Sequence, residues 1–188
     1  MRVLVVGDAS VARALERLLV NESGVDGQYY VVERLDRYPP ENSPDLAAPS
    51  YEIALVQSRD RTGDEQVIDA LLPLVPVVIL LVAVPDTAAC VAALRRGAWD
   101  YVEMAPRAGD AIQAVMDSMS EGVKTLGVGR AGTDVEWIRE HFQQLHASHA
   151  DQWIAVRNAE VIAADVLFAR LHRREETEGA TFWKIPRA

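Results

Sequence analysis

Short apolar runs alternate with amphipathic stretches over the first 122 residues of the chain. We expect the apolar runs to form five strands, at residues 3–6, 29–32, 51–56, 76–82 and 101–102. Apolar runs without polar alternation are typical of parallel strands that are buried on both faces. Strands that alternate with helices predict a parallel sheet covered by helices on both sides.

Several connecting stretches carry apolar residues at helical spacing. Helices are expected after Ser10, which can cap the first of them, at 64–72, at 87–96, and along a stripe that ends at Met119. Gly97 follows 87–96 directly, where a glycine commonly ends a helix. The connection between the second and third strands is polar and predicts a loop. That loop contains three prolines, Pro39, Pro40 and Pro44.

The pattern changes after residue 122. Residues 123–133 are rich in glycine, show no period and predict a linker between a first domain, 1–122, and a second, 134–188. The second domain predicts a small α+β fold that opens with a helix carrying Val135, Ile138, Phe142 and Leu145. Its later elements are a hairpin of 153–156 and 160–163 around Asn158-Ala159, a short helix at 166–171 and a closing strand at 181–185.

Charge is distributed unevenly between these parts. The net charge is −9, and residues 1–122 hold 19 acids and 10 bases, whereas residues 123–188 hold nine of each. Because a phosphate backbone attracts a basic face, the acidic first domain predicts that nucleic acid is not the ligand.

Two features bear on where the chain works. The apolar run 70–85 has only 16 residues and contains three prolines, so we expect no membrane helix there. Cys90 is the only cysteine, and the first residues read as a strand without a cleavable leader. The single cysteine and the first strand without a cleavable leader both favour a cytoplasmic protein.

The segment Ala93–Tyr101 (ALRRGAWDY) resembles the signature before the fifth strand of bacterial receiver domains of two-component signalling. The resemblance covers residues 1–122 and implies a doubly wound, flavodoxin-like parallel sheet of order 2-1-3-4-5. It also implies a phosphorylation pocket. That pocket has acids after strand one, an aspartate after strand three, a hydroxyl after strand four and a lysine after strand five.

Most positions of that pocket differ in this chain. Gly7 replaces one of the two strand-one acids and Asp8 keeps the other, while Gln57 stands at the phosphate acceptor, Val82 at the hydroxyl and Met104 at the lysine. An amide cannot form an acyl phosphate and brings no charge to hold Mg²⁺. We therefore expect a degenerate receiver, or pseudo-receiver, that binds proteins without phosphorylation, is not an enzyme, and needs no cofactor or metal.

The resemblance also points to a docking surface. In receivers, helix four, strand five and helix five form the face that mediates dimerisation and partner docking, and Tyr101 matches the aromatic residue that reports the switch state. Arg95, Arg96 and Trp99 lie in the same region, and arginine and aromatic residues are enriched at interface hot spots. We expect a homodimer or another protein partner there. In the alternative, Trp99 packs in the core and the arginines are solvated.

Two other functions remain open. Gly7, Ala9 and Ala12, with Glu33 after the second strand, resemble a relaxed dinucleotide fingerprint of a Rossmann-like nucleotide-binding domain. The two alanines crowd the approach of a pyrophosphate, which weighs against that function. A structural subunit of a larger assembly is the other alternative.

Two further patterns lie in the second part of the chain. Residues 127–132 match the spacing G-x-G-x-x-G but are better explained as linker. His141, His146 and His149 fall on one predicted helix, and the last two have a spacing that could share a metal. Since no cluster of cysteines or carboxylates lies near them, surface histidines are the preferred interpretation.

Residues 134–188 resemble a small uncharacterised prokaryotic domain that implies no known activity. The resemblance rests on Trp153–Val156, on Glu160–Ala163, and on a closing strand that ends at Pro186. The aromatic residues Phe182 and Trp183 of that strand predict either a sheet edge that pairs with a partner or residues of the core.

Overall fold

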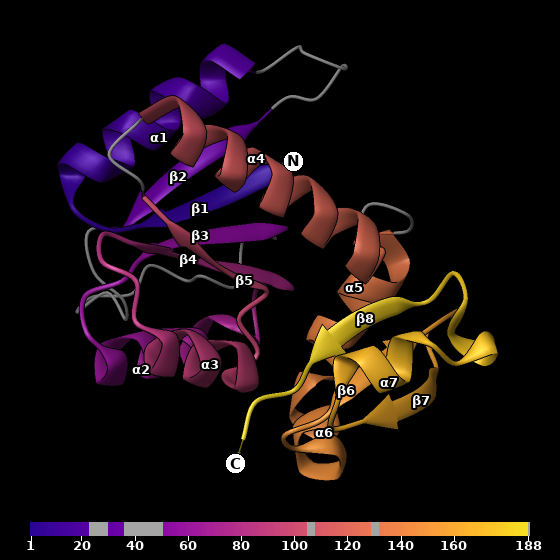
Figure 1. The fold of residues 1–188 in the computed structure, drawn as a ribbon. Helices are drawn as coiled ribbons and strands as arrows, with labels where there is room; N and C mark the ends of the chain where they lie inside the picture. Colours follow the sequence, from indigo (N-terminus) through magenta and orange to yellow (C-terminus); the bar gives the residue numbers. More distant parts are fainter. Residues whose placement is uncertain (23–29, 36–50, 105–107, 129–131, 188) are drawn as a thin grey trace. The chain divides into compact units, whose positions relative to one another are not determined.

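The computed structural model describes residues 1–22, 30–35, 51–104, 108–128 and 132–187. The chain forms two compact units, Met1–Ser120 and Glu121–Ala188, which are drawn from indigo to yellow along the sequence in Figure 1. The predicted loop with three prolines lies outside the described residues.

The first unit contains a five-stranded parallel sheet of order β2-β1-β3-β4-β5, which confirms the predicted topology. Its strands are β1 (Arg2–Val6), β2 (Val31–Leu35), β3 (Ile53–Gln57), β4 (Val77–Val82) and β5 (Asp100–Glu103). Its helices are α1 (Ala9–Glu22), α2 (Arg61–Leu71), α3 (Thr87–Arg96) and α4 (Ala108–Leu126), whose residues from Glu121 onward belong to the second unit. Figure 1 shows α1 and α4 on one face of the sheet and α2 and α3 on the other.

The central strands are apolar because helices cover both of their faces. All six residues of β4 are buried, and so are the first four of β3. Asp60 caps α2 and Asp86 caps α3 through side-chain bonds to backbone N–H groups. Gly97 ends α3 with a φ of 117°, a left-handed conformation that suits glycine.

Three local predictions were wrong. Ser10 lies inside α1, which begins at Ala9, so it does not cap that helix. Strand β2 begins at Val31 and runs on to Leu35. Residues 123–126 form the last turn of α4 instead of a linker, and Leu126 in this glycine-rich stretch is fully buried.

The second unit is built on an antiparallel sheet of order β7-β6-β8. Its strands are β6 (Trp153–Val156), β7 (Val161–Asp165) and β8 (Thr181–Lys184). Its helices are α5 (Gly132–Glu140), α6 (Phe142–His149), α7 (Phe168–His172) and a 3-10 turn, η2 (Glu175–Thr177). The predicted first helix is therefore two helices, with His141 between them.

The hairpin between β6 and β7 is confirmed. Asn158 and Ala159 both have positive φ angles, 55° and 60°, as a two-residue hairpin turn of type I′ requires. Arg157 and Glu160 exchange two backbone hydrogen bonds across the turn, at 3.0 and 3.3 Å.

The closing strand supplies core residues. Trp183 is fully buried and Phe182 is 4% exposed, so the core-packing alternative for both holds. The Phe182 ring meets Phe168 edge-on at 5.5 Å. Among the described helices, none has the length and apolar character needed to cross a membrane.

Candidate functional site

The candidate site lies where β1 and β3 end side by side. The two strands are paired with Val6 beside Val56, so the residues that follow, Gly7 and Asp8, stand next to Gln57. Carboxyl ends of adjacent parallel strands are where open α/β sheets form their binding crevices. The structure thus brings together the positions that the sequence singled out on these two strands.

Gln57 ties the two strand ends to each other. Its Oε1 accepts a hydrogen bond from the backbone N–H of Asp8 at 2.7 Å, and its Nε2 donates to Asp8 Oδ2 at 3.4 Å. The side chain lies directly over Gly7, where an added Cβ would come within 2.8 Å of both Gln57 Cβ and Oε1. Glycine at position 7 and glutamine at position 57 are therefore fitted to each other.

This packing bears on the dinucleotide alternative. A phosphate approaching the β1–α1 turn needs the space above the first glycine and the free N–H groups that follow it. The side chain of Gln57 takes both the space above Gly7 and the N–H of Asp8. The carboxylate of Asp8 adds a negative charge at the same place.

Arg59 supplies a positive charge that sequence reasoning missed. Its Nη2 lies 3.2 Å from Asp8 Oδ1, and both side chains are about half exposed. A carboxylate that would otherwise favour a cation thus already has a guanidinium beside it. The only signal in the sequence is that Arg59 follows Gln57 by two residues, on the same side of an extended chain.

Asp64 fixes the loop between β3 and α2. This buried carboxylate accepts from Ser58 Oγ at 2.6 Å and from the backbone N–H of Arg59 at 3.2 Å. Asp60 Oδ1 accepts from the N–H of Gly63 at 2.8 Å. Asp60 and Asp64 therefore both hold backbone in place, and the position of Asp60 directly before a helix could have suggested such a role.

A cavity of about 200 Å³ opens at this place. Gly7, Gln57 and Arg59 line it together with Asp60 and Asp64. Four polar side chains in its wall, those of Gln57, Arg59, Asp60 and Asp64, already bond to other groups of the chain.

Val82 and Met104 lie on the neighbouring strands and outside the lining of this cavity. Val82 is buried at the end of β4, and its carbonyl accepts from the N–H of Met104 at 2.7 Å. The two positions are thus adjacent, as the resemblance implies, and both carry apolar side chains.

Tyr101 lies half-buried on β5 against the core of the first unit. Burial raises the pKa of its phenol, and the nearby carboxylates of Asp64 and Asp86 raise this pKa further. A backbone hydrogen bond at Asp86 acts in the opposite direction and lowers it. The phenol is thus held neutral beside the loop after β4.

The four residues of the predicted docking surface differ in their surroundings. Arg96 is bound within the unit, because its guanidinium pairs with the carboxylate of Asp69 on α2. Trp99 is half-buried and Arg95 is exposed. The outward side of α3 also carries large apolar side chains. Val91 is 40% exposed and Leu94 is 42% exposed, and Val84 before the helix is 80% exposed.

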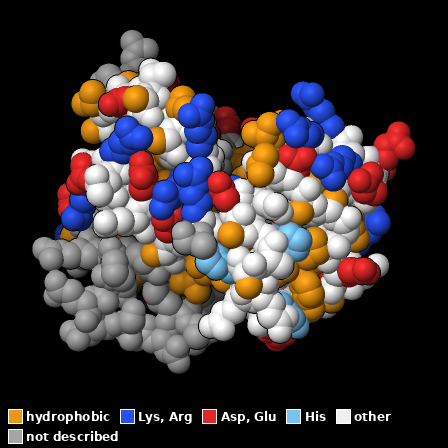
Figure 2. Space-filling view, turned by 90° about the horizontal axis from the view of Figure 1, so that it is seen from below, with side chains coloured by type: hydrophobic (Ala, Val, Ile, Leu, Met, Phe, Trp, Pro, Cys, Tyr) orange, Lys and Arg blue, Asp and Glu red, His pale blue; other side chains and the backbone are white. Residues whose placement is uncertain are grey.

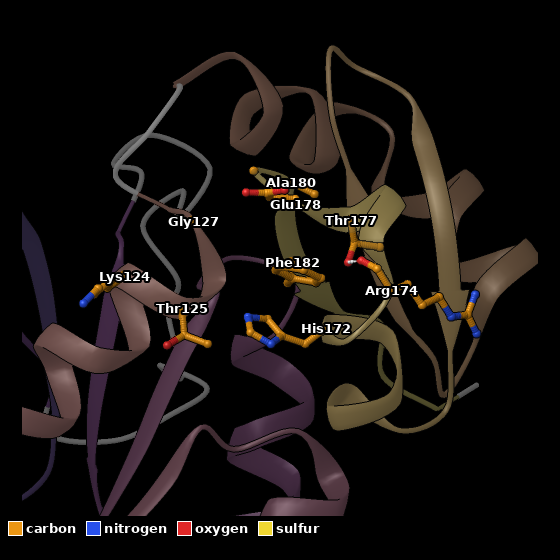
Figure 3. A pocket seen from close by; sticks show the side chains of 10 residues that line it. Lys124, Thr125, Gly127, His172, Arg174, Thr177, Glu178, Ala180 and Phe182 are labelled. Atoms are coloured by element: carbon orange, nitrogen blue, oxygen red, sulfur yellow. Dashed lines mark hydrogen bonds between the residues drawn. The ribbon is translucent and has the colours of Figure 1, made fainter.

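A separate cavity of about 420 Å³ lies within the second unit. Figure 3 shows His172 and Phe182 facing it, with Thr125 opposite, while Arg174 points away. Arg174 is paired with Asp165 at 2.7 Å. Of the residues that the sequence analysis singled out, Gly127 and Phe182 line this cavity. The sequence did not predict the cavity, since its walls come from segments far apart in the chain.

The histidines of the second unit make separate contacts. His146 Nε2 lies 3.3 Å from the carbonyl of Arg187, and His149 Nδ1 lies 3.3 Å from Gln152 Oε1. Histidine side chains reach the surface in Figure 2. Over the part of the chain that the structure describes, no group of three or more potential ligands is placed to hold a metal.

The chain was compared with known proteins. No protein-family profile matches the sequence, and no curated protein does. Solved structures do match. The signal receiver domain of a protein described as a Luxo repressor, from Vibrio parahaemolyticus, has 18% identity and a TM-score of 0.50, covering 69% of this chain and 98% of that one.

Two weaker matches are also response regulators. The receiver domain of NarL from Mycobacterium tuberculosis has 22% identity and a TM-score of 0.44, covering 63% of this chain and 95% of that one. The orphan response regulator HP1043 of H. pylori has 19% identity and a TM-score of 0.42, covering 63% and 96%. At such identities the likeness to the Vibrio domain shows the fold alone. The five-stranded unit has the receiver fold.

Proposed function

We propose that this protein is an atypical response regulator-like binding protein that works without phosphorylation. The observation that carries the proposal is the pairing of Gln57 with Asp8, since an amide at the end of β3 occupies the place where receivers carry their acceptor carboxylate. Arg59 supports it, because its guanidinium neutralises Asp8 without a divalent cation.

The binding surface in this proposal is the outward side of α3. Val91 and Leu94 are three residues apart and therefore adjacent on the helix, with Arg95 beside them and Val84 before the helix. Exposed apolar side chains next to an arginine are typical of a protein-docking site. The partner is a protein. The elements α3, β5 and α4 stand where receivers have helix four, strand five and helix five. A homodimer through them stays a prediction that the same variants test.

Incubation with acetyl phosphate and Mg²⁺, followed by intact-mass measurement, tests the first part of the proposal. We expect no phosphoryl adduct on the native protein. We also expect no saturable change in fluorescence when beryllofluoride and Mg²⁺ are added to the Trp137→Phe/Trp153→Phe/Trp183→Phe variant, which retains Trp99 as its only tryptophan. A stable adduct would overturn the proposal.

Variants of α3 test the second part. Val91→Glu/Leu94→Glu should abolish capture of a protein partner, whereas Val31→Glu, on strand β2 and 57% exposed, should leave that capture intact. An unchanged partner and particle mass in the α3 variant would remove this surface from the proposal.

A further inference from the structure

Strand β7 is the open edge of the sheet in the second unit. Among the described residues of the second unit, the order β7-β6-β8 leaves one side of β7 without a neighbouring strand. All five residues of β7 are half-buried, whereas all four residues of β8, at the opposite edge, are buried. Val166 and Leu167 follow β7 directly and are 56% and 53% exposed.

Backbone groups of β7 face that open side. The carbonyl of Gln152 accepts from the N–H of Ile185 at 2.8 Å, so Ile154, two residues further along the strand, also directs its backbone groups toward β8. Ala164 lies opposite Ile154 in the pairing of β6 with β7. The N–H and C=O of Ala164 therefore point away from β6, toward the open edge.

Edge strands are usually guarded by charge. At the edges of the five-stranded sheet, β2 carries Glu33 and Arg34, and β5 carries Asp100 and Glu103. Strand β7 has the sequence VIAAD, so Asp165 is its only charged residue.

Asp165 does not guard the edge, because it is used within the unit. Its side chain is only 7% exposed and pairs with Arg174 at 2.7 Å and with Arg170 at 3.8 Å. Strand β7 and the two residues after it, Val166 and Leu167, therefore offer an apolar edge with no outward charge, a pattern that favours strand addition.

We propose that β7 pairs antiparallel with β7 of a second copy of this chain, joining two three-stranded sheets into one sheet across a two-fold axis. An apolar strand without like charges is complementary to itself in this arrangement. Residues 123–188 hold nine acids and nine bases, so two copies of this unit do not repel each other, unlike two copies of residues 1–122 at −9 each. Dimerisation through β7 does not depend on the proposed function.

Sedimentation velocity of the full chain over a range of concentrations tests the proposal. We expect a monomer–dimer equilibrium that Ala164→Pro weakens at least about tenfold, because proline removes an outward N–H twice per dimer and leaves the bonds to β6 in place. Val166→Lys should weaken it similarly, and circular dichroism and thermal unfolding establish that both variants fold.

Val31→Lys is the matched control, since Val31 lies on the edge strand β2 and is 57% exposed, against 56% for Val166. It should leave the dimer unchanged. The proposal is overturned if the wild-type chain stays monomeric, or if folded Ala164→Pro and Val166→Lys variants dimerise as the wild type does. Loss of the dimer in Val91→Lys/Leu94→Lys alone would also overturn it and would place self-association on α3.

Discussion

At the scale of single residues, the site is defined by a pair of mutually dependent positions. Gln57 can reach the N–H of Asp8 only because position 7 has no side chain. Arg59 adds a charge that balances Asp8 from the same strand end. The two strand ends are thus held by the chain's own groups.

Gly7→Ala should destabilise the first unit by about 1–3 kcal/mol, because the new Cβ would lie 2.8 Å from two atoms of Gln57. Urea unfolding followed by circular dichroism measures the change. Gly63→Ala is the control, since its Cβ would meet Asp60 at an ordinary 3.4 Å. Adding Gln57→Gly to Gly7→Ala should recover part of the loss, and equal effects of both glycine variants would contradict the explanation.

At the scale of elements, the second unit depends on a hairpin and on an anchored last strand. Ala159 holds a positive φ, and its N–H donates to the buried carboxylate of Asp134 at 2.9 Å. Lys184 of β8 is 2% exposed and donates to both the carbonyl and the carboxylate of Asp151. Local backbone strain is thus compensated by specific polar contacts.

Ala159→Gly should stabilise the second unit by about 0.5–1 kcal/mol. Glycine adopts the left-handed conformation without the cost that alanine incurs, and this gain exceeds the loss from a more flexible unfolded chain. Ala163→Gly, in the middle of β7, should instead cost about 0.5–1 kcal/mol. Thermal unfolding compares the two, and a destabilised Ala159→Gly variant would contradict the turn geometry.

Asp151 makes the second unit sensitive to acid. Burial alone would raise its pKa, but the hydrogen bonds and charges of Lys184 and Arg187 outweigh burial and lower the pKa below the ordinary 3.8. Because the folded pKa is lowered, the stabilisation is present above about pH 4 and is lost as pH falls through the folded value.

Asp151→Asn should therefore be less stable than the wild type at neutral pH, with the difference shrinking below the unfolded pKa of 3.8. Asp151 has a positive φ of 61°, which asparagine also adopts readily. The loss of the negative charge is therefore the main effect of the substitution. Urea unfolding at a series of pH values measures the difference in the free energy of unfolding between the variant and the wild type. Glu176→Gln, which replaces an exposed acid, is the control. A difference that does not vary with pH would refute the role of the charge.

At the scale of the whole molecule, the chain combines an acidic receiver-fold unit with a smaller unit of balanced charge. The excess of nine acids lies in residues 1–122. Acidic and basic side chains are interspersed with apolar ones on the face shown in Figure 2. Such a distribution suits protein partners better than phosphate backbones.

The full chain should not retard a DNA duplex in an electrophoretic mobility assay at about 50 mM salt, where phosphate contacts are strongest. The physical reason is repulsion between the phosphates and a chain of net charge −9. Retardation that weakens steeply as salt is raised would contradict this expectation and would indicate a basic surface on the second unit.

Much of the fold could be predicted because its signals are local. The buried run of β4, Gly97 after α3 and the hairpin turn at Asn158-Ala159 each follow from periodicity or from backbone preferences of a few adjacent residues. The linker prediction was wrong for residues 123–126, which continue α4, and Leu126 among them is fully buried although the stretch is rich in glycine.

The sequence by itself determined the order of strands and helices, the apolar centre of the sheet and the amide at position 57, since these depend on neighbouring residues and residue chemistry. Only the tertiary structure decided that Arg59 faces Asp8, that Arg96 is held by Asp69, and that β7 is the open edge of its sheet. Each of these depends on which distant segments the folded chain brings side by side, and periodicity carries no information about that.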